Sequence, residues 1–364
     1  MKAIVTVEQA QFNIDFNAPL DISIPLNGTQ ENPNAWYLDA PQILPVTMGD
    51  WVGSVASGTS STNFNSIWFN PHAHGTHTEC VGHITVPFYS INSCLKNFMF
   101  LAEVISVKPI LIQNDWVITL EEIKKLKLHK NTRAIVIRTL PNNLDKLKKQ
   151  YSHTNPPYFE PEVMSYFVAL GIDHILVDLP SVDKEKDEGK LLCHKAFWCL
   201  DDVKEPEAKT RFNATITEFI YVNNSITDGL YVLNLQIASF LNDASPSKPI
   251  LYKIDLEVDE NASNFYVNID RRLVKIQFSD VNFIEAKGDY ILIKTITVNH
   301  TVHTTLKKIQ KLLPKKTFLK IHRSFIINID KIVDIEGNSV LISKDVIPIS
   351  RSFRKELLDN INLL

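Results

Sequence analysis

The chain has 364 residues, of which 45% are hydrophobic, 22% charged and 9% aromatic, a composition typical of a folded globular protein. It contains no run of about eighteen apolar residues, which argues against a transmembrane helix. Polar residues interrupt the N-terminal stretch MKAIVTVEQAQFNIDF, which excludes the apolar core of a signal peptide. The chain has four cysteines, Cys80, Cys94, Cys193 and Cys199. Their positions show neither CxxC spacing nor a disulfide framework, so we expect a cytoplasmic protein.

The net charge of -3 conceals a difference between the two ends of the chain. Residues 1–254 carry 21 Lys+Arg against 27 Asp+Glu, whereas residues 261–364 carry 17 against 10. The sequence between them is polar and acidic, so we predict a domain at 1–254, a linker at 255–264 and a second domain at 265–364. The positive excess of the second domain fits a polyanionic partner, and it fits a solvated surface equally well.

The first domain opens with apolar and polar residues in alternation at 12–26, which predicts strands that break at Pro19. A loop rich in Asn, Pro and Gly follows. Residues 51–70 then have a strand-like composition with small-residue turns, and they lead directly into a stretch that contains several histidines.

Residues 71–83, PHAHGTHTECVGH, hold four of the eleven histidines: His72, His74, His77 and His83. Imidazole and carboxylate groups are the ordinary ligands of zinc and related metals. In an extended segment His77 and Glu79 point to the same face, which suits two ligands on one metal or one carboxylate shared by two. Gly75 is expected to make a positive-φ turn that brings both flanks together. The alternative is a polar loop of hydrogen-bonded histidines.

The following residues alternate between apolar strands and short helices, which indicates an α/β fold. A helix is predicted at 118–126, opened by Thr119, and another at 160–169, followed by Gly171. His194 falls on a helix or loop that begins at residue 191, and Glu218 falls in an apolar strand. The predicted strands cover residues 101–112, 133–140, 172–179, 230–236 and 250–254.

Residues 1–254 resemble the cyclase family of metal-dependent hydrolases, which includes bacterial kynurenine formamidase (arylformamidase). The family pattern HxGTHxDxxxH follows a strand of the type DLSxPL, and residues 21–26 here read DISIPL. The GTH core ends at His77, Glu79 replaces the family's Asp, and His83 falls on the final His. The family's first His corresponds to Ala73, so either His72 or His74 takes its place after a shift of one residue.

This resemblance implies a swivelling β/β/α domain that forms homo-oligomers and binds one or two divalent ions, Zn²⁺ or Mn²⁺. It assigns proton transfer to His83 as the catalytic acid and base. On its own His194 would be read as a surface histidine, whereas burial of Glu218 among apolar neighbours favours a ligand role. The metal ligands implied by the resemblance are His72, His77, Glu79, His194 and Glu218.

The second domain contains many short apolar runs and one predicted helix, at 304–313, which ends before Pro314, so we expect a mostly β fold. Residues 265–358 resemble the LytTR domain, a DNA-binding module of bacterial transcriptional regulators. Three segments carry the resemblance in order along the chain, and they are DVNFIEAKGDY at 280–290, FLKIHRSF at 318–325 and IPISR at 347–351.

By this resemblance the second domain contacts double-stranded DNA through loops that bear basic residues. A structural ion pair is the alternative for Arg323, and His322 is expected to be structural. The predicted contacts are Lys287, Arg323 and Arg351, supported by Lys320, Ser324 and Ser352.

Together the resemblances imply a metal-dependent hydrolase of linear or cyclic amides, of the arylformamidase type found in tryptophan catabolism, joined to a transcription-regulator domain. The alternative is a one-component transcriptional regulator in which the cyclase-like domain only senses a ligand or a metal. We expect a small amide substrate, double-stranded DNA and further copies of the chain as partners, and no membrane.

Overall fold

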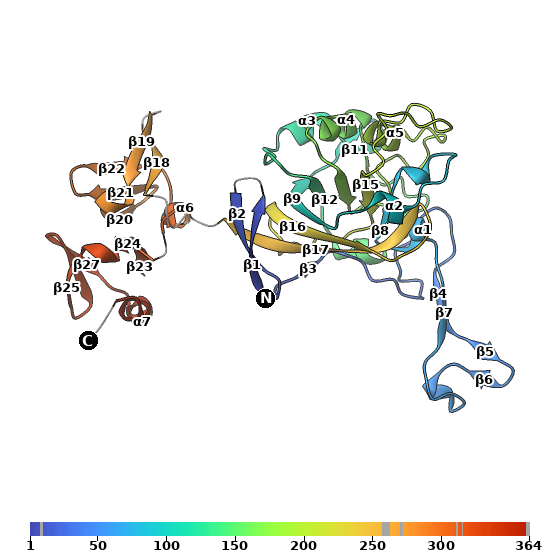
Figure 1. The fold of residues 1–364 in the computed structure, drawn as a ribbon, viewed down its shortest axis with the longest axis horizontal. Coiled ribbons are helices and arrows are strands. Elements are labelled where there is room, and N and C mark those ends of the chain that lie inside the picture. The colour runs from blue at the N-terminus through green and yellow to red at the C-terminus, as the bar shows by residue number, and fades with distance from the viewer. Residues whose placement is uncertain (8–9, 257–262, 270–271, 311, 315, 362–364) are drawn as a thin grey trace. The chain divides into compact units, whose positions relative to one another are not determined.

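The structure is a computed structural model that describes residues 1–7, 10–256, 263–269, 272–310, 312–314 and 316–361 (Figure 1). The chain separates into two compact units, Met1–Asp255 and Leu256–Leu364. Most of the predicted linker, residues 257–262, lies outside the described residues. The strand before it ends at Leu256 and the strand after it begins at Asn264.

The first unit combines long and short strands with five short helices among its described residues. The helices are α1 (Pro71–His74), α2 (Ile91–Cys94), α3 (Leu120–Lys124), α4 (Pro161–Ala169) and α5 (Leu192–Trp198). The strands are β1 (Lys2–Val7), β2 (Ala10–Asp15), β3 (Leu20–Asp21), β4 (Gln42–Pro45), β5 (Thr47–Met48), β6 (Trp51–Val52), β7 (Asn65–Trp68), β8 (His77–Glu79), β9 (Met99–Val107), β10 (Ile110–Ile112), β11 (Asp115–Ile118), β12 (Ala134–Thr139), β13 (Tyr158–Phe159), β14 (His174–Val177), β15 (Thr215–Glu218), β16 (Gly229–Ile237) and β17 (Ala244–Leu256).

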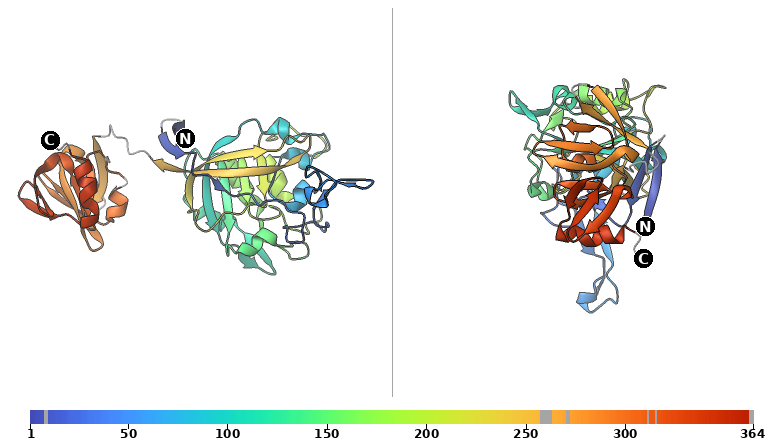
Figure 2. Two further views of the ribbon diagram at one scale, coloured as in Figure 1. Left: turned by 90° about the horizontal axis from the view of Figure 1, so that it is seen from below. Right: turned by 90° about the vertical axis from the view of Figure 1, so that its left-hand side faces the viewer.

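The main sheet of this unit closes on itself. Its strand order is β1-β2-β17-β16-β9-β12-β14-β15-β8, and β8 also pairs with β17. The long strand β17 therefore contacts β16 along most of its length and β8 at its N-terminal end (Figure 2). This closure places β8, which carries the predicted metal ligands His77 and Glu79, between β15 and β17.

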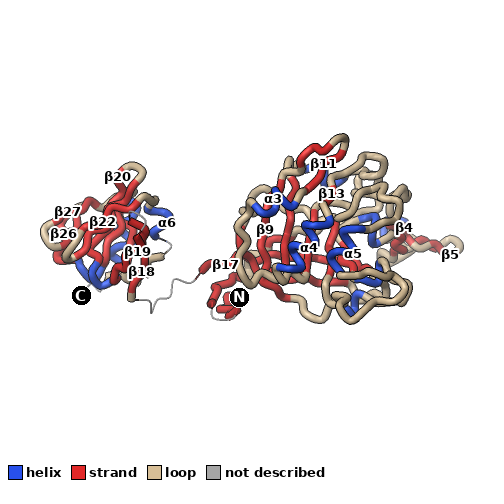
Figure 3. The backbone as a smooth tube through the Cα atoms, turned by 90° about the horizontal axis from the view of Figure 1, so that it is seen from above, coloured by secondary structure: helices blue, strands red, loops and turns tan. Residues whose placement is uncertain are grey.

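Successive side chains of the central strands point to opposite faces of the sheet, so each face is covered by its own apolar core. In β12, Ile135 and Ile137 pack with residues of α4 and α5, whereas Ala134 and Val136 pack inside the closed sheet. Helices α3, α4 and α5 lie over the outer face of these strands (Figure 3). A fully buried layer on each side accounts for the continuous apolar runs of the sequence.

Local signals explain where the helices begin and end. The Thr119 side chain accepts the Glu122 backbone N–H and so caps α3, as its position predicted. Helix α4 begins with Pro161, whose fixed φ suits the first turn, and Gly171 follows it with φ of +78°. The mixed α/β class expected for this unit is confirmed.

The second unit is mostly β, as expected. It contains one five-stranded, one three-stranded and one two-stranded sheet among its described residues. The elements are β18 (Asn264–Ile269), β19 (Arg272–Gln277), β20 (Val281–Lys287), β21 (Tyr290–Thr295), β22 (Asn299–Val302), α6 (Leu306–Gln310), β23 (Phe318–His322), β24 (Phe325–Asn328), β25 (Ile332–Glu336), β26 (Ser339–Ile342), β27 (Asp345–Pro348) and α7 (Arg351–Asp359).

The sequence predicted one helix in this unit, but the described residues form two. Helix α6 lies within the predicted range, whereas α7 was not predicted. The last helix buries Leu357 in the core that contains Ile321 and Ile347, so packing against β23 and β27 stabilises it. No helix in the described part of the chain is long and apolar enough to cross a membrane.

A buried histidine away from the predicted site makes the first unit sensitive to acid. His174 is 4% exposed, and its Nδ1 lies 2.8 Å from the Thr215 Oγ1. Burial, together with the charges of Arg133 and Arg211, lowers the pKa of His174 to about 3. Because the unfolded chain would protonate this group near pH 6.5, the folded state loses stability as the pH falls from about 6.5 towards 3.

We therefore expect His174→Gln to flatten the pH dependence of the unfolding free energy. Between pH 7.5 and 5.5 the unfolding free energy of the parent should fall by about 1.4 kcal/mol more than that of the variant, because His174 takes up a proton only in the unfolded parent. Urea unfolding followed by tryptophan fluorescence measures this, since all five tryptophans belong to the first unit. Parallel curves for the two proteins would contradict the assignment.

Candidate metal centre

Strand pairing places three acidic and imidazole side chains on one face. Strand β8 pairs with β15 so that His77 lies opposite Glu218, and Glu79, two residues further on, shares that face. Thr78 and Thr217 are also opposite each other, and their hydroxyl oxygens meet 2.8 Å apart on the other side. The same-face arrangement predicted from the spacing is therefore present, with Glu218 brought in by the neighbouring strand.

Three short helical segments add the other imidazoles. His72 lies on α1, His194 lies on α5, and His83 ends the 3-10 turn Val81–His83. Their ring nitrogens lie 3.0 Å (His72), 3.8 Å (His83) and 3.0 Å (His194) from the Glu79 carboxylate. Gly82 lets the turn approach the neighbouring chain, because a Cβ there would lie 2.1 Å from the Tyr89 carbonyl oxygen.

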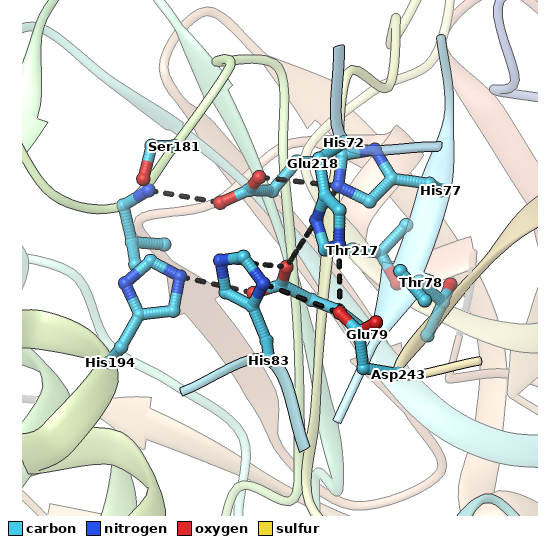
Figure 4. A network of polar contacts seen from close by, with 12 residues as sticks. His72, His77, Thr78, Glu79, His83, Ser181, His194, Thr217, Glu218 and Asp243 are labelled. Atoms are coloured by element: carbon cyan, nitrogen blue, oxygen red, sulfur yellow. Dashed lines mark hydrogen bonds and ion pairs between the residues drawn. The ribbon is translucent and has the colours of Figure 1, made fainter. Parts of the chain in front are cut away.

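Each histidine of the cluster turns one nitrogen inward and has an acceptor near the other; Figure 4 shows the inner contacts and the contacts of Asp243. The inner nitrogens of His72, His83 and His194 face Glu79, and the His77 Nε2 lies 3.4 Å from Glu218. The outer nitrogens face Asp243 for His72 and His83, the Gly75 carbonyl for His77, and Asp183 for His194. Outer acceptors of this kind fix the tautomer and ring orientation of metal-binding histidines.

Two buried atoms at the centre lack a hydrogen bond among the described residues. They are the His77 Nε2 and the Glu79 Oε2, and both side chains are at most 1% exposed. The His72 Nδ1 lies 3.0 Å from the Glu79 Oε2 but outside hydrogen-bond geometry, and ligand atoms of His72, His77 and Glu79 all lie within 4.8 Å of one another. Leaving such groups unpaired is costly, and a divalent ion would satisfy both.

The donor set fits a divalent metal. Three overlapping triads of side chains could each hold an ion, because the ligand atoms within each triad lie within 4.8 Å of one another. The triads are His72–His83–Asp243, His72–His77–Glu79 and Glu79–His83–His194. Imidazole nitrogen with carboxylate oxygen is a donor set typical of zinc, and it also serves manganese.

Without a metal, the carboxylates around His72 and His194 favour the protonated form of these two imidazoles. Burial opposes a charge on His72, but its contacts with Asp243 and Glu79 raise its pKa to about 10. Burial likewise opposes a charge on His194, and bonds with Asp183 and Glu79 raise its pKa above the ordinary value. A metal must displace these protons, so its affinity falls as the pH falls.

The structure places His72 in the cluster and His74 outside it, two positions that the sequence left as alternatives. The His74 Nδ1 accepts the Asn70 backbone N–H at 2.8 Å, and its ring packs beside Trp68. The turn predicted at Gly75 is wrong. Its φ of 161° is extended backbone, and the short helix α1 makes the reversal instead.

Two carboxylates of the site were not predicted as site residues. Asp183 precedes α5 and contacts His194, and Asp243 precedes β17 and contacts His72 and His83. Both become neighbours of the histidines only through tertiary folding. Asp243 lies in a loop without any motif, so no signal in the sequence marks it.

In the second unit, backbone bonds bring the three LytTR-like segments together. The Ala286 N–H donates to the Ser324 carbonyl at 2.8 Å, which joins the turn after Lys287 to the turn between β23 and β24. The Ser350 N–H donates to the Ile321 carbonyl at 2.9 Å, which places the start of α7 beside the same region.

The predicted DNA contacts lie on these joined segments and differ in their local pairing. Within the described residues neither Arg323 nor Arg351 forms an ion pair, and both are exposed. Lys287 contacts Glu285 at 3.4 Å. The His322 Nδ1 accepts the Ser324 backbone N–H at 3.2 Å, a structural contact. Lys320 lies on β23, Ser324 in the adjoining turn and Ser352 in the first turn of α7.

Comparison with known families confirms both resemblances. Residues 20–184 match the family described as Putative cyclase, and residues 271–362 match the LytTr DNA-binding domain.

Individual relatives are distant. The sensory transduction protein LytT of Bacillus anthracis is 30% identical over 95 residues, which cover 24% of this chain and 39% of that protein. The chain therefore spans about two-fifths of that relative. Among solved structures, a predicted metal-dependent hydrolase from Bacillus stearothermophilus is 15% identical, with a TM-score of 0.46 over 65% of this chain and 98% of that one. Isatin hydrolase A from Labrenzia aggregata is 14% identical, with a TM-score of 0.46 over 65% and 93%.

Proposed function

We propose that this chain, which joins a cyclase-family region to a LytTR DNA-binding region, is a metal-dependent hydrolase of linear or cyclic amides that also binds DNA. One observation supports the hydrolase part above all. Four imidazoles turn one nitrogen each towards Glu79 and Glu218, and two buried atoms at that centre have no other partner among the described residues.

The proposed ligands are His72, His77, Glu79, His194 and Glu218, and the proposed metal is Zn²⁺, with Mn²⁺ as the alternative. When bound, the ion would supply a hydroxide nucleophile near neutral pH and polarise the substrate carbonyl.

The protein's own groups would orient these ligands and move the proton. The Val182 N–H donates to the Glu218 Oε1 at 3.2 Å, which leaves the Oε2 directed at His77. The His83 side chain is 29% exposed, more than those of the other cluster histidines, so it is the imidazole best placed to reach a substrate. We assign it the transfer of a proton to the leaving amine.

Hydrolysis of two amides by the full-length protein tests this proposal. N-formylkynurenine represents a linear formamide, and isatin represents a cyclic amide. We expect Zn²⁺- or Mn²⁺-loaded protein to hydrolyse at least one of them, with loss of activity after chelation and recovery on reloading. Metal-loaded protein that hydrolyses neither would contradict an arylformamidase-like activity.

A second candidate is a one-component regulator whose cyclase-like unit senses a metal or a ligand. The departure at Ala73 favours it, because the family's ligand pattern has a histidine at that position. A DNA affinity that changes on metal loading, without any amide turnover, would support this candidate over the enzyme.

For the second unit we propose that Lys287, Arg323 and Arg351 contact bases or phosphates, with Lys320, Ser324 and Ser352 in support. Two arginines without an ion pair among the described residues, on segments that backbone bonds hold together, support this assignment. Homo-oligomerisation through the first unit would present several such surfaces to one duplex, and light scattering of the purified chain measures the oligomeric state.

We expect Arg323→Ala and Arg351→Ala each to weaken specific DNA binding by about 1–3 kcal/mol, as is usual for a lost base contact. A site selected from random duplexes with the parent protein provides the probe, and binding is measured at several salt concentrations because phosphate contacts are salt-dependent. Arg272→Ala, an exposed change in the separate β18–β19 hairpin, is the control. Equal losses in all three variants would argue against a specific surface.

A further inference from the structure

One carboxylate oxygen contacts two stacked histidines at the edge of the metal centre. The Asp243 Oδ2 lies 2.8 Å from the His72 Nε2 and 3.4 Å from the His83 Nδ1 (Figure 4). The two rings are stacked, with centroids 4.2 Å apart and planes inclined by 29°. A single acceptor therefore constrains both imidazoles.

Asp243 belongs by distance to one of the three triads, but it contacts the nitrogens of His72 and His83 that face away from Glu79, which places it outside the proposed ligand set. His72 presents Nδ1 to Glu79 and Nε2 to Asp243, and His83 presents Nε2 to Glu79 and Nδ1 to Asp243. The two nitrogens of an imidazole point in diverging directions, so an oxygen on the outer nitrogen is on the far side of the ring from Glu79. Asp183 has the same relation to His194, whose Nδ1 faces Asp183 while its Nε2 faces Glu79.

The backbone fixes this carboxylate relative to the cluster. The Cys80 N–H donates to the Asp243 carbonyl at 3.0 Å, and the next residue, Ala244, is the β17 partner of Glu79. The Asp243 side chain is 22% exposed, so it forms part of the rim of the site.

We propose that Asp243 is a positioning residue of the metal centre that acts through His72, an inference that rests on the proposed metal-binding function. In this chain Ala73 stands where the family pattern has its first histidine, and His72 reaches the centre from the adjacent position. A carboxylate on the outer nitrogen holds this ring with Nδ1 facing inward. Outer-shell carboxylates of this kind typically change metal affinity about 10–100-fold.

Zinc binding to the full-length protein, measured by competition with a chelating dye, tests the proposal. We expect Asp243→Asn to weaken zinc binding about 10–100-fold. Asp243→Glu should weaken zinc binding less, because it keeps a carboxylate. Asp202→Asn, an exposed change in the loop after α5, should leave zinc binding unchanged. Tryptophan fluorescence unfolding of each variant confirms that the first unit is folded.

A double-mutant cycle separates positioning from direct ligation. If Asp243 acts through His72, Asp243→Asn has no further effect on zinc affinity in a His72→Ala protein but keeps its effect in a His83→Ala protein. An undiminished effect in the His72→Ala protein would overturn the proposal, as would unchanged affinity in Asp243→Asn. Failure of the parent chain to bind zinc would instead refute the proposed function.

Discussion

His77→Ala should remove most of the metal from the full-length protein. The parent is expected to hold one to two divalent ions per chain, and the variant should bind them at least about 100-fold more weakly, beyond the range typical of outer-shell losses. The reason is geometric, because the buried His77 Nε2 has no hydrogen bond among the described residues and lies between Glu79 and Glu218. Elemental analysis after dialysis, followed by chelator competition, measures both quantities.

The matched control is His74→Ala, a histidine from the same stretch. His74 is also fully buried, but its ring contacts Asn70 and Trp68 rather than the cluster. Its removal should affect stability through lost packing while metal content stays at the parent level. A parent protein that purifies without metal and cannot be loaded, or a His77→Ala protein that binds as the parent does, would refute the metal centre.

Elements stabilised by local patterns were predictable from the sequence, whereas those stabilised by distant contacts were not. The apolar run of β12 and the capping residue Thr119 predicted their elements correctly. Helix α7 was missed because it is largely polar and is anchored by Leu357 against residues of β23 and β27. The four-residue helix α1 was missed because it is only one turn long, so the reversal was attributed to Gly75.

The residues of the candidate site likewise differ in whether the sequence alone could identify them. His77 and Glu79 share a face because of strand geometry alone, which the spacing reveals. His194 was identified only through the family resemblance, and Glu218 also through its place among apolar neighbours, since the approach of both to β8 depends on the fold. Asp243 was unpredictable because its place follows from the pairing of β17 with β8, strands separated by more than half of the first unit.

His83→Ala should retain metal and lose turnover. His83 is the most exposed histidine of the cluster, and its Nε2 lies 3.8 Å from the Glu79 Oε2, further than the inner nitrogens of His72 and His194. A group at this position is better placed to exchange a proton with a substrate than to hold an ion permanently. Loss of a general acid and base typically costs 10²–10⁴-fold in rate, and we expect roughly that reduction in kcat for whichever amide the parent hydrolyses.

The decisive comparison measures metal content and turnover on the same preparation of protein. His153→Ala, an exposed histidine outside the cluster, is the control and should match the parent in both measurements. If His83→Ala loses its metal together with its activity, His83 is a ligand, and the proton must be transferred by another group. If it keeps both, His83 has no part in the reaction. Full metal with activity reduced by two to four orders of magnitude is the result that our division of roles requires, because a proton carrier that is not a ligand can be removed without disturbing the ion.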